Sequence, residues 1–238
     1  MSERQREISQ NIARIQEEIK AAALRVGRKP EEITLIAASK TQTSETIRDA
    51  IAAGIRVCGE NRVQELLPHL EDDAYEGAEV HFIGHLQTNK VRQIVGEVSL
   101  IQSVDSERLL DEIEKQAQKQ GIVQDILIEV NIGLEENKGG VFPENLPYLV
   151  EYSKGLSHVR LRGLMCIPPA DAEENQLRTL FAQTKQLFVD TRCKMGDNIS
   201  DIDCLSMGMS GDFSLAIEEG ATMVRVGTAI FGARPPLR

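Results

Sequence analysis

Short apolar segments alternate with amphipathic segments along most of the chain. Eight segments have the length and composition of buried strands: residues 33–39, 56–58, 80–84, 99–104, 125–131, 161–167, 204–207 and 223–227. Helical spacing of apolar residues marks seven segments between or after them: 44–53, 61–70, 89–96, 106–120, 143–156, 173–193 and 212–219. Strict alternation with short connections predicts an α/β fold with a parallel sheet. Eight units in 238 residues predict a single closed (β/α)8 TIM barrel, and an open doubly wound sheet is the alternative.

The first 30 residues predict an extra N-terminal helix. Apolar residues recur there at every third or fourth position: Ile8, Ile12, Ile15, Ile19, Ala23 and Val26. This amphipathic pattern ends near Gly27 and Pro30, and we expect the helix to cover the barrel from outside or from below. Polar residues occur from the first positions on without an apolar centre, which argues against a signal peptide. We expect one domain over residues 1–238, with residues 1–30 as its helical cover.

Composition narrows the partners and the compartment. The 27 basic and 37 acidic residues give a net charge of −10, which makes the backbone of nucleic acid an unexpected partner. No apolar run approaches the roughly 18 residues of a membrane span, so we expect a cytoplasmic protein. Three of the four cysteines fall in predicted strands without a CxxC pair, which indicates buried thiols in a reducing compartment. The four histidines lack zinc-ligand spacing, so no metal site is expected.

Lys40 follows the apolar strand 33–39 and is the strongest candidate for chemistry. Burial beside such a strand disfavours the charged ammonium, and a neutral amine can attack an aldehyde or ketone to form a Schiff base. A solvated lysine at the end of a strand is the plainer alternative. Lys90 and Lys138 also follow predicted strands, but the segment before Lys40 is more apolar.

Two turns near the C-terminus have the composition of phosphate-binding turns. Ser210 precedes the helical segment 212–219 and is a good N-cap type, so its hydroxyl and the amides after it would face an anion. Gly227 ends the eighth strand and lets a phosphate approach the backbone, and Thr228 adds a hydroxyl. Simple helix capping and chain reversal are the plainer alternatives. In a barrel, both turns would lie beside Lys40, which predicts an aldehyde-bearing phosphate ester as ligand.

Four further residues lie at or inside predicted strands and are candidates for ligand contact. Asn61 follows the second strand, His85 follows the third, and Met165 lies in the sixth. Their plainer alternatives are a helix cap, a surface histidine and barrel filling. Arg225 interrupts the apolar strand 223–227, so it needs a partner inside the barrel. That partner is either the ligand or a carboxylate such as Glu129.

Six motifs resemble the pyridoxal phosphate homeostasis protein family, whose barrel is similar to the N-terminal domain of alanine racemase. They are Ser39-Lys40-Thr41, Gly59-Glu-Asn-Arg-Val-Gln-Glu65, His81-Phe-Ile-Gly-His-Leu-Gln-Thr-Asn-Lys90, Arg162-Gly-Leu-Met165, Ser206-Met-Gly-Met-Ser-Gly-Asp212 and Arg225-Val-Gly-Thr-Ala-Ile-Phe-Gly232. The resemblance covers almost the whole chain. It implies that the protein binds pyridoxal 5′-phosphate (PLP) as an internal aldimine.

The same resemblance implies a role for six of the candidate residues. Lys40 would carry the aldimine, Asn61 would line the cofactor, and Arg225 would face the pyridine nitrogen. A guanidinium only donates hydrogen bonds, so this nitrogen would stay unprotonated. Ser210, Gly227 and Thr228 would hold the phosphate group, whereas His85 and Met165 are candidates from their strand positions alone. The chain reads Asn137-Lys-Gly-Gly140 where the family often has Lys-Ser-Gly, which leaves the roles of Lys138 and the Gly139-Gly140 turn open.

The family is implicated in vitamin B6 and amino-acid homeostasis without established catalysis. Related racemases take a second base, a tyrosine, from a C-terminal domain, whereas this chain ends eleven residues after Gly227. Its tyrosines, Tyr75, Tyr148 and Tyr152, fall in a predicted loop and helix. We therefore expect a monomeric, non-catalytic carrier whose partners are PLP-dependent apo-enzymes or a regulator. The alternatives are a slow PLP-dependent racemase or lyase, or a Schiff-base aldolase for a phosphorylated sugar.

Overall fold

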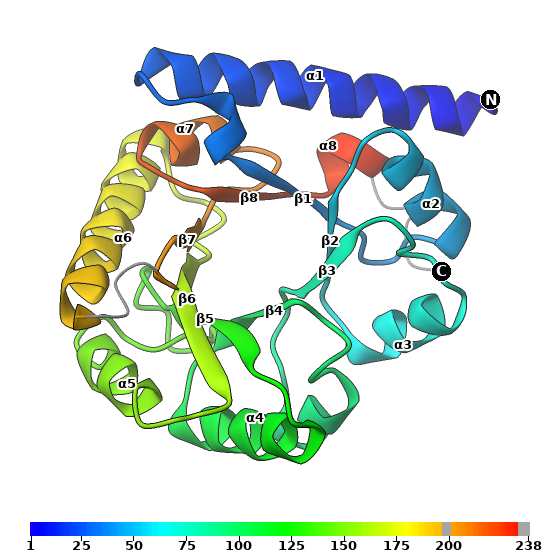
Figure 1. The fold of residues 1–238 in the computed structure, drawn as a ribbon. Helices are drawn as coiled ribbons and strands as arrows, with labels where there is room; N and C mark the ends of the chain where they lie inside the picture. The colour runs from blue at the N-terminus through cyan, green and yellow to red at the C-terminus, as the bar shows by residue number, and fades with distance from the viewer. Residues whose placement is uncertain (197–200, 233–238) are drawn as a thin grey trace.

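The strands form a closed barrel (Figure 1). The computed structural model describes residues 1–196 and 201–232. All strands are parallel and pair in chain order, and β8 pairs back with β1. The strands are β1 (Thr34–Ala38), β2 (Val57–Glu60), β3 (Glu79–Phe82), β4 (Leu100–Val104), β5 (Gln124–Val130), β6 (Val159–Cys166), β7 (Cys204–Ser206) and β8 (Met223–Val226). The predicted (β/α)8 barrel is confirmed, and the open sheet is excluded by the β1–β8 pairing.

Helices surround the barrel and follow the strands. They are α2 (Ser44–Ala52), α3 (Val63–Glu71), η2 (Thr88–Gln93), α4 (Glu107–Gln120), α5 (Leu146–Ser153), α6 (Glu174–Lys194), α7 (Phe213–Glu218) and α8 (Thr228–Phe231). The segment 89–96 forms only the short 3₁₀ helix η2, in which Thr88, Asn89 and Val91 are poor helix formers. The predicted helix 143–156 begins only at Leu146, where Pro147 fits the first turn. The four residues of α8 were not predicted.

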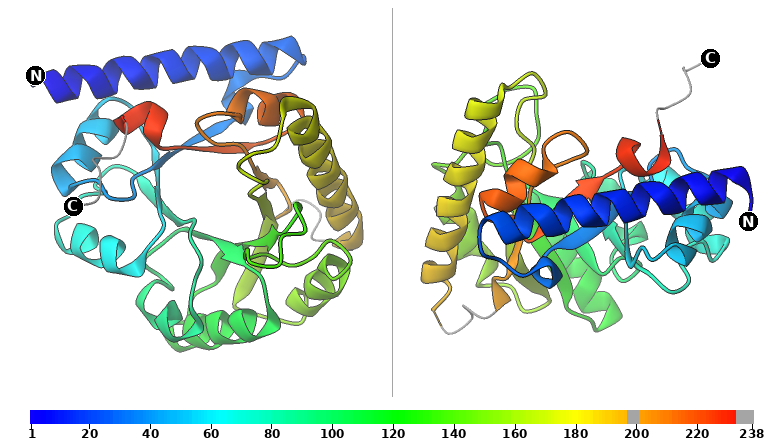
Figure 2. Two further views of the ribbon diagram at one scale, coloured as in Figure 1. Left: turned by 180° about the vertical axis from the view of Figure 1, so that it is seen from behind. Right: turned by 90° about the horizontal axis from the view of Figure 1, so that it is seen from above.

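The N-terminal helix α1 (Glu3–Arg25) lies across the outside of the barrel (Figure 2). It contacts α2, α7 and α8, and its buried face contains Ile8, Ile12, Ile15 and Ile19. A short 3₁₀ helix, η1 (Pro30–Glu32), leads from it into β1. The expected outer cover is therefore confirmed, and it lies over the seam where β8 meets β1.

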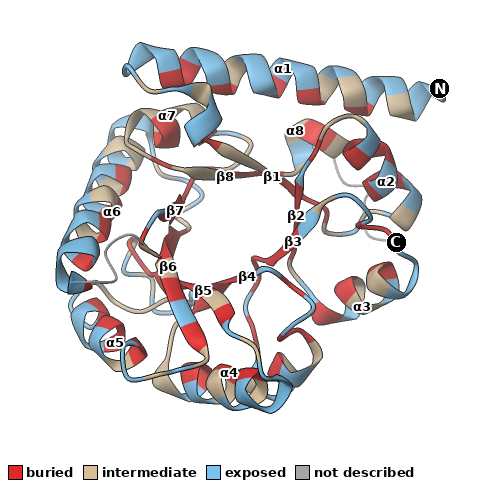
Figure 3. Ribbon diagram, viewed as in Figure 1, coloured by how far each residue is buried: buried red, intermediate tan, exposed pale blue. Residues whose placement is uncertain are grey.

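Two apolar regions hold the barrel together. The larger lies between the strands and the surrounding helices, where buried residues line the inner helix faces (Figure 3). The smaller lies inside the barrel and consists of Leu100, Leu127, Met165 and Cys204, with Met223 and Ile167 packed against it. Met165 thus fills the barrel. The rest of the interior includes buried polar side chains, which is the part that carries chemistry.

The compositional expectations have structural counterparts within the described residues. Cys58, Cys166 and Cys204 are buried and Cys193 is exposed, all as free thiols. Burial, with the charge of Glu60, raises the pKa of the Cys58 thiol to about 12. Over residues 1–196 and 201–232, no helix combines the length and apolar character needed to cross a bilayer. The same residues contain no cluster of three or more side chains suited to a metal ion.

The α1 interface gives a direct test of the packing. Ile15→Ala removes a fully buried side chain and should lower the free energy of unfolding by about 2–5 kcal/mol. Leu24→Ala, on the same helix, removes a side chain that is 58% exposed and should change it by less than about 0.5 kcal/mol. Urea unfolding of both variants measures the difference. Equal costs would mean that α1 does not pack on the barrel in solution.

Candidate functional site

The turn after β1 presents Lys40 at the carboxyl end of the barrel. Ser39 is buried and Lys40 is half-buried. Thr41 adopts a left-handed backbone conformation with φ of 67°, which is uncommon for a β-branched residue. Its amide donates to Glu65 Oε2 at 3.1 Å, and the Gln42 amide donates to the Ser39 carbonyl at 2.9 Å. The backbone around Lys40 is therefore held in one tight turn.

The buried side chain of Glu60 stabilises this turn through a hydrogen bond from Ser39. Glu60 is completely buried at the end of β2, and its Oε1 accepts hydrogen bonds from Ser39 Oγ at 2.6 Å and Tyr75 OH at 2.7 Å. His69 Nδ1 lies 3.4 Å from the same oxygen, and its hydrogen bond with Glu60 raises the pKa of this histidine. Sequence reasoning missed this network, although a lone Glu at the end of an apolar strand was a signal for it. Lys40 directly follows one of its members.

Asn61 directly follows another member of this network, Glu60, and has a buried side-chain oxygen, Oδ1, without a hydrogen-bond partner among the described residues. Helix α3 is preceded by Arg62 as N-cap, so the alternative of Asn61 as the helix cap is wrong. A buried acceptor without a partner is costly, and it indicates a group that a ligand can satisfy.

Ser210 joins the two predicted phosphate turns. Asp212 occupies the N-cap position of helix α7, so the plainer alternative, that Ser210 only caps this helix, is wrong. Both residues are good cap types two positions apart, and the helix begins after the second. Ser210 Oγ instead accepts hydrogen bonds from the amides of Gly227 at 3.2 Å and Ala229 at 3.3 Å. The loops after β7 and β8 are thereby connected.

Several backbone amides in these loops remain available, among them those of Gly211 and Thr228. These two amides donate no hydrogen bond within the described part of the chain. A Cβ atom added at Gly211 would meet no other atom within 4 Å, so open space lies beside this amide. Unpaired amides next to open space, together with the Thr228 hydroxyl, suit an anion.

Arg225 lies inside the barrel with 4% of its surface exposed. Its Nη1 donates to Ser206 Oγ at 2.6 Å and its Nη2 to the Cys166 carbonyl at 2.8 Å. Among the described residues it forms no ion pair, so the alternative of a structural ion pair with Glu129 is wrong. Burial raises the pKa of Glu129 to about 7, an effect that the charge of Arg225 opposes and that of Asp105 adds to.

A cavity of about 260 Å³ brings these residues together. Its lining consists of Ala38, Lys40, Asn61, Ile83, Ile167, Met209, Ser210, Gly211, Arg225, Gly227 and Thr228. Six of the eight predicted site residues are among them. The other two lie elsewhere: His85 is exposed, and Met165 packs in the apolar layer of the barrel. Lys90 and Lys138 are also outside the lining.

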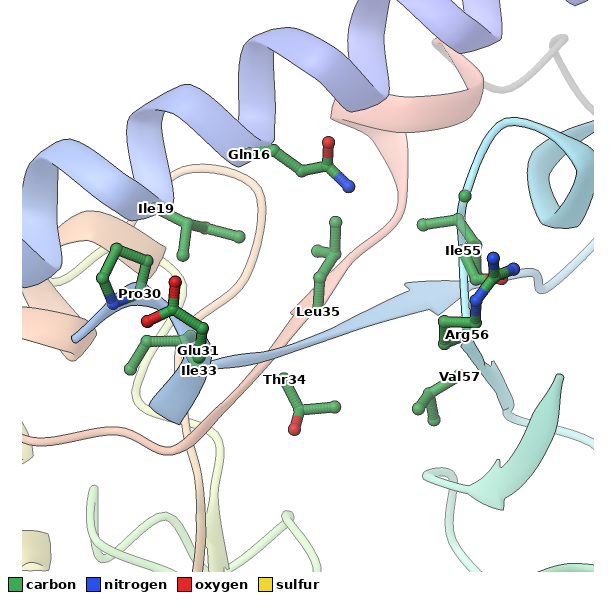
Figure 4. A pocket seen from close by; sticks show the side chains of 11 residues that line it. Gln16, Ile19, Pro30, Glu31, Ile33, Thr34, Leu35, Ile55, Arg56 and Val57 are labelled. Carbon is green, nitrogen blue, oxygen red and sulfur yellow. The ribbon is translucent and has the colours of Figure 1, made fainter.

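A larger cavity, about 480 Å³, lies at the other end of the barrel beneath α1 (Figure 4). Ile19, Ile33 and Leu35 contribute to its mainly aliphatic walls, and Gln16 and Arg56 are exposed side chains at its edge. It lacks the convergence of buried polar groups that marks the smaller cavity. Active sites of this fold lie at the carboxyl ends of the strands, so the smaller cavity is the candidate site.

Comparison with known proteins gives a consistent result. The family model described as alanine racemase, N-terminal domain, matches residues 6–235. A pyridoxal phosphate homeostasis protein of Aquifex aeolicus is 48% identical over 225 residues, which cover 94% of this chain and 97% of the relative.

Two solved structures extend the comparison. An unknown protein from Bifidobacterium adolescentis superposes with a TM-score of 0.91 at 35% identity, covering 97% of each chain. PipY of Synechococcus elongatus PCC7942, solved with PLP bound, superposes with a TM-score of 0.75 at 33% identity, covering 94% of this chain and 100% of PipY.

The raised pKa of Glu129 predicts a pH-dependent stability. Because its folded pKa of about 7 exceeds the ordinary 4.5, the folded protein binds this proton more tightly than the unfolded chain does. This contribution to stability is present below pH 4.5 and is lost as the pH rises through about 7. The loss is on the order of 3 kcal/mol for a shift of this size.

Glu129→Gln removes the titration, so the variant should gain stability relative to the wild type between about pH 4.5 and about pH 8. Urea unfolding at both pH values measures the difference. Glu136→Gln, which changes an exposed carboxylate in the following loop, is the control. A difference between Glu129→Gln and the wild type that is constant across the two pH values would contradict the raised pKa.

Proposed function

The chain belongs to the alanine racemase N-terminal domain family, among its pyridoxal phosphate homeostasis proteins, and we propose that it binds PLP in the 260 Å³ cavity. In this role it holds the cofactor and passes it to apo-enzymes that need it, as part of vitamin B6 and amino-acid homeostasis. One observation carries the proposal: a lysine, a buried arginine and the two connected turns surround a single cavity at the carboxyl ends of β1, β7 and β8.

The residues of the cavity suit the chemistry of PLP. The phosphate needs donors, and the amides of Gly211 and Thr228 are unpaired within the described residues. The pyridine nitrogen is an acceptor, and the guanidinium of Arg225 only donates. Asn61 Oδ1 is a buried acceptor without a partner, which the phenolic hydroxyl of the cofactor or a bound water can satisfy.

The bound cofactor supplies an aldehyde that an amine can attack. Lys40 is the lysine in the lining of the cavity, and we assign it this role. The tight turn that holds its backbone, with the Glu60 network behind it, fixes the direction from which the side chain enters the cavity. Ser210 has an indirect role, since it connects the two turns that would receive the phosphate.

Two features favour binding over turnover: the donor at the ring nitrogen and the positions of the tyrosines. Arg225 would leave the pyridine nitrogen unprotonated, which weakens the cofactor as an electron sink. Tyr75 is buried and donates to Glu60, whereas Tyr152, on α5, donates to Asp111. Tyr148 is exposed on the same helix. None of these tyrosines is in the lining of the cavity, so none is placed as the second base of a racemase. The racemase family fold favours a slow racemase as the second candidate.

Absorption spectroscopy tests the role of Lys40. Protein incubated with PLP should show a visible band that Lys40→Ala lacks, because the covalent link to the cofactor is lost. Borohydride reduction followed by peptide mass mapping should place the pyridoxyl group on Lys40. Lys90→Ala is the matched control, since Lys90 lies outside the lining, and it should keep the band. A band that survives in Lys40→Ala, or a label on another lysine, would refute the assignment.

An activity assay separates the two candidate functions. L-Alanine incubated with PLP-loaded protein should lose optical rotation no faster than with Lys40→Ala, because no tyrosine lines the cavity as a second base among the described residues. Chiral chromatography of the amino acid gives the measurement. Racemisation that scales with wild-type protein and disappears in Lys40→Ala would favour the slow racemase.

A further inference from the structure

A chain of hydrogen bonds crosses the interior of the barrel from the candidate site. It begins at Arg225 on β8, whose Nη1 lies 2.6 Å from Ser206 Oγ on β7. Ser206 Oγ lies 2.7 Å from Gln102 Oε1 on β4, and Gln102 Nε2 lies 2.9 Å from His81 Nδ1 on β3. All four side chains are buried, and Gln102 and Ser206 are completely so. Only Arg225 among them lines the 260 Å³ cavity.

The chain has one favoured direction. The guanidinium only donates, so Ser206 Oγ accepts from Arg225 and gives its own hydrogen to Gln102 Oε1. The amide nitrogen of Gln102 then donates to His81 Nδ1, which requires a neutral imidazole with its hydrogen on Nε2. Burial lowers the pKa of His81 to about 4, which keeps the imidazole neutral. Each of the three bonds that link Arg225 to His81 then pairs one donor with one acceptor.

The far end of the chain reaches a second polar cavity. His81 Nε2 lies 3.8 Å from Glu79 Oε2 and belongs to the lining of a cavity of about 310 Å³ at the amino ends of the strands. A donor at Nε2 therefore faces an acceptor and space for water. The surroundings of Nε2 suit a hydrogen on that atom, which leaves Nδ1 free to accept from the Gln102 amide.

The direction of these hydrogen bonds stabilises the buried charge of Arg225. The charged or titratable groups around the guanidinium are Glu129 on β5, Asp212 before α7 and Cys166 on β6, and none forms an ion pair with it. Burial lowers the pKa of Arg225, so its charge needs stabilisation from dipoles. Ser206 and Gln102 both turn an oxygen toward Arg225, and such aligned dipoles strengthen one another in a dry interior.

We propose that Gln102 is a positioning residue for Arg225, and that through Ser206 it sets the hydrogen bond from the guanidinium to the ring nitrogen of bound PLP. This inference rests on the proposed function. Gln102 does not line the cavity, so its effect would reach the cofactor only through its hydrogen bond with Ser206 and that of Ser206 with Arg225. Loss of the Gln102 amide leaves Ser206 without its acceptor, and the hydroxyl then turns and no longer fixes the guanidinium.

The ¹⁵N chemical shift of ring-labelled PLP tests the proposal directly. In the full-length wild type it should be that of an unprotonated, hydrogen-bonded pyridine. In Gln102→Leu it should move toward the value of free PLP in the same buffer. The dissociation constant for PLP should rise by no more than about tenfold, because Lys40 and the phosphate turns are unchanged.

Two control variants separate positioning from general destabilisation. Gln102→Glu with a protonated carboxyl can still accept from Ser206 and donate to His81, so it should keep the wild-type shift. Gln124→Leu removes another buried glutamine, on β5, that bonds to the backbone of Gly96 and Val98. This glutamine takes no part in the hydrogen bonds that link Arg225 to His81. It should lower stability and leave the ¹⁵N shift unchanged.

The outcomes distinguish the two proposals. If the wild type takes up no PLP, the proposed function fails and this inference fails with it. If the wild type binds PLP and Gln102→Leu keeps the wild-type ¹⁵N shift, or Gln124→Leu moves it equally, only the positioning role is overturned. If Gln102→Leu does not fold, Ser206→Ala, which deletes the direct acceptor of Arg225, should give the same shift, and an unchanged value there also overturns the role.

Discussion

The buried guanidinium of Arg225 constrains the whole interior of the barrel. A cation without an ion pair is costly to bury, and here its partners are a hydroxyl, a backbone carbonyl and, beyond them, the Gln102 amide. These groups occupy interior space that most barrels of this type fill with aliphatic side chains. The apolar cluster inside the barrel is correspondingly small and consists of four buried residues, Leu100, Leu127, Met165 and Cys204. An interior divided in this way leaves a polar half in which a polar ligand can be recognised.

A second polar network lies on the outer side of the sheet and consists of Glu60, Ser39, Tyr75 and His69. Its members come from β2, from α3 and from the segments after β1 and α3, so it ties the segment that contains Lys40 to β2 and α3. Lys40 and Asn61 each follow a member of this network by one residue. Strand geometry turns consecutive side chains to opposite faces, so a residue anchored outside directs its successor inward. The cavity is thus held from outside by Glu60 and from inside by Arg225.

The sequence predicted those features that arise from local pattern. Alternation of apolar and amphipathic segments was sufficient for the barrel, and the lone charge in an apolar strand was sufficient to single out Arg225. Gln102 is one of several uncharged polar residues in segment 99–104, and its role depends on Ser206, which is 104 positions away in the chain. The sequence alone did not exclude Ser210 as the cap of α7, because Ser210 and Asp212 are both suitable and only packing chooses between them. Long-range partners and choices between equivalent caps are properties of the folded chain.

The same constraint bears on why a racemase-like barrel would serve as a carrier. Exchange of an amine at the aldehyde of PLP needs a reactive carbonyl and a lysine, and it creates no carbanion. Racemisation creates one and therefore needs a protonated ring nitrogen, or another electron sink, as well as a second base. A donor-only guanidinium held by Ser206 would oppose protonation of that nitrogen and would leave the aldehyde end of the cofactor unaffected. In the proposed complex, the hydrogen-bond direction inside the barrel would thus favour storage and transfer of the aldehyde over chemistry at the α-carbon of an amino acid.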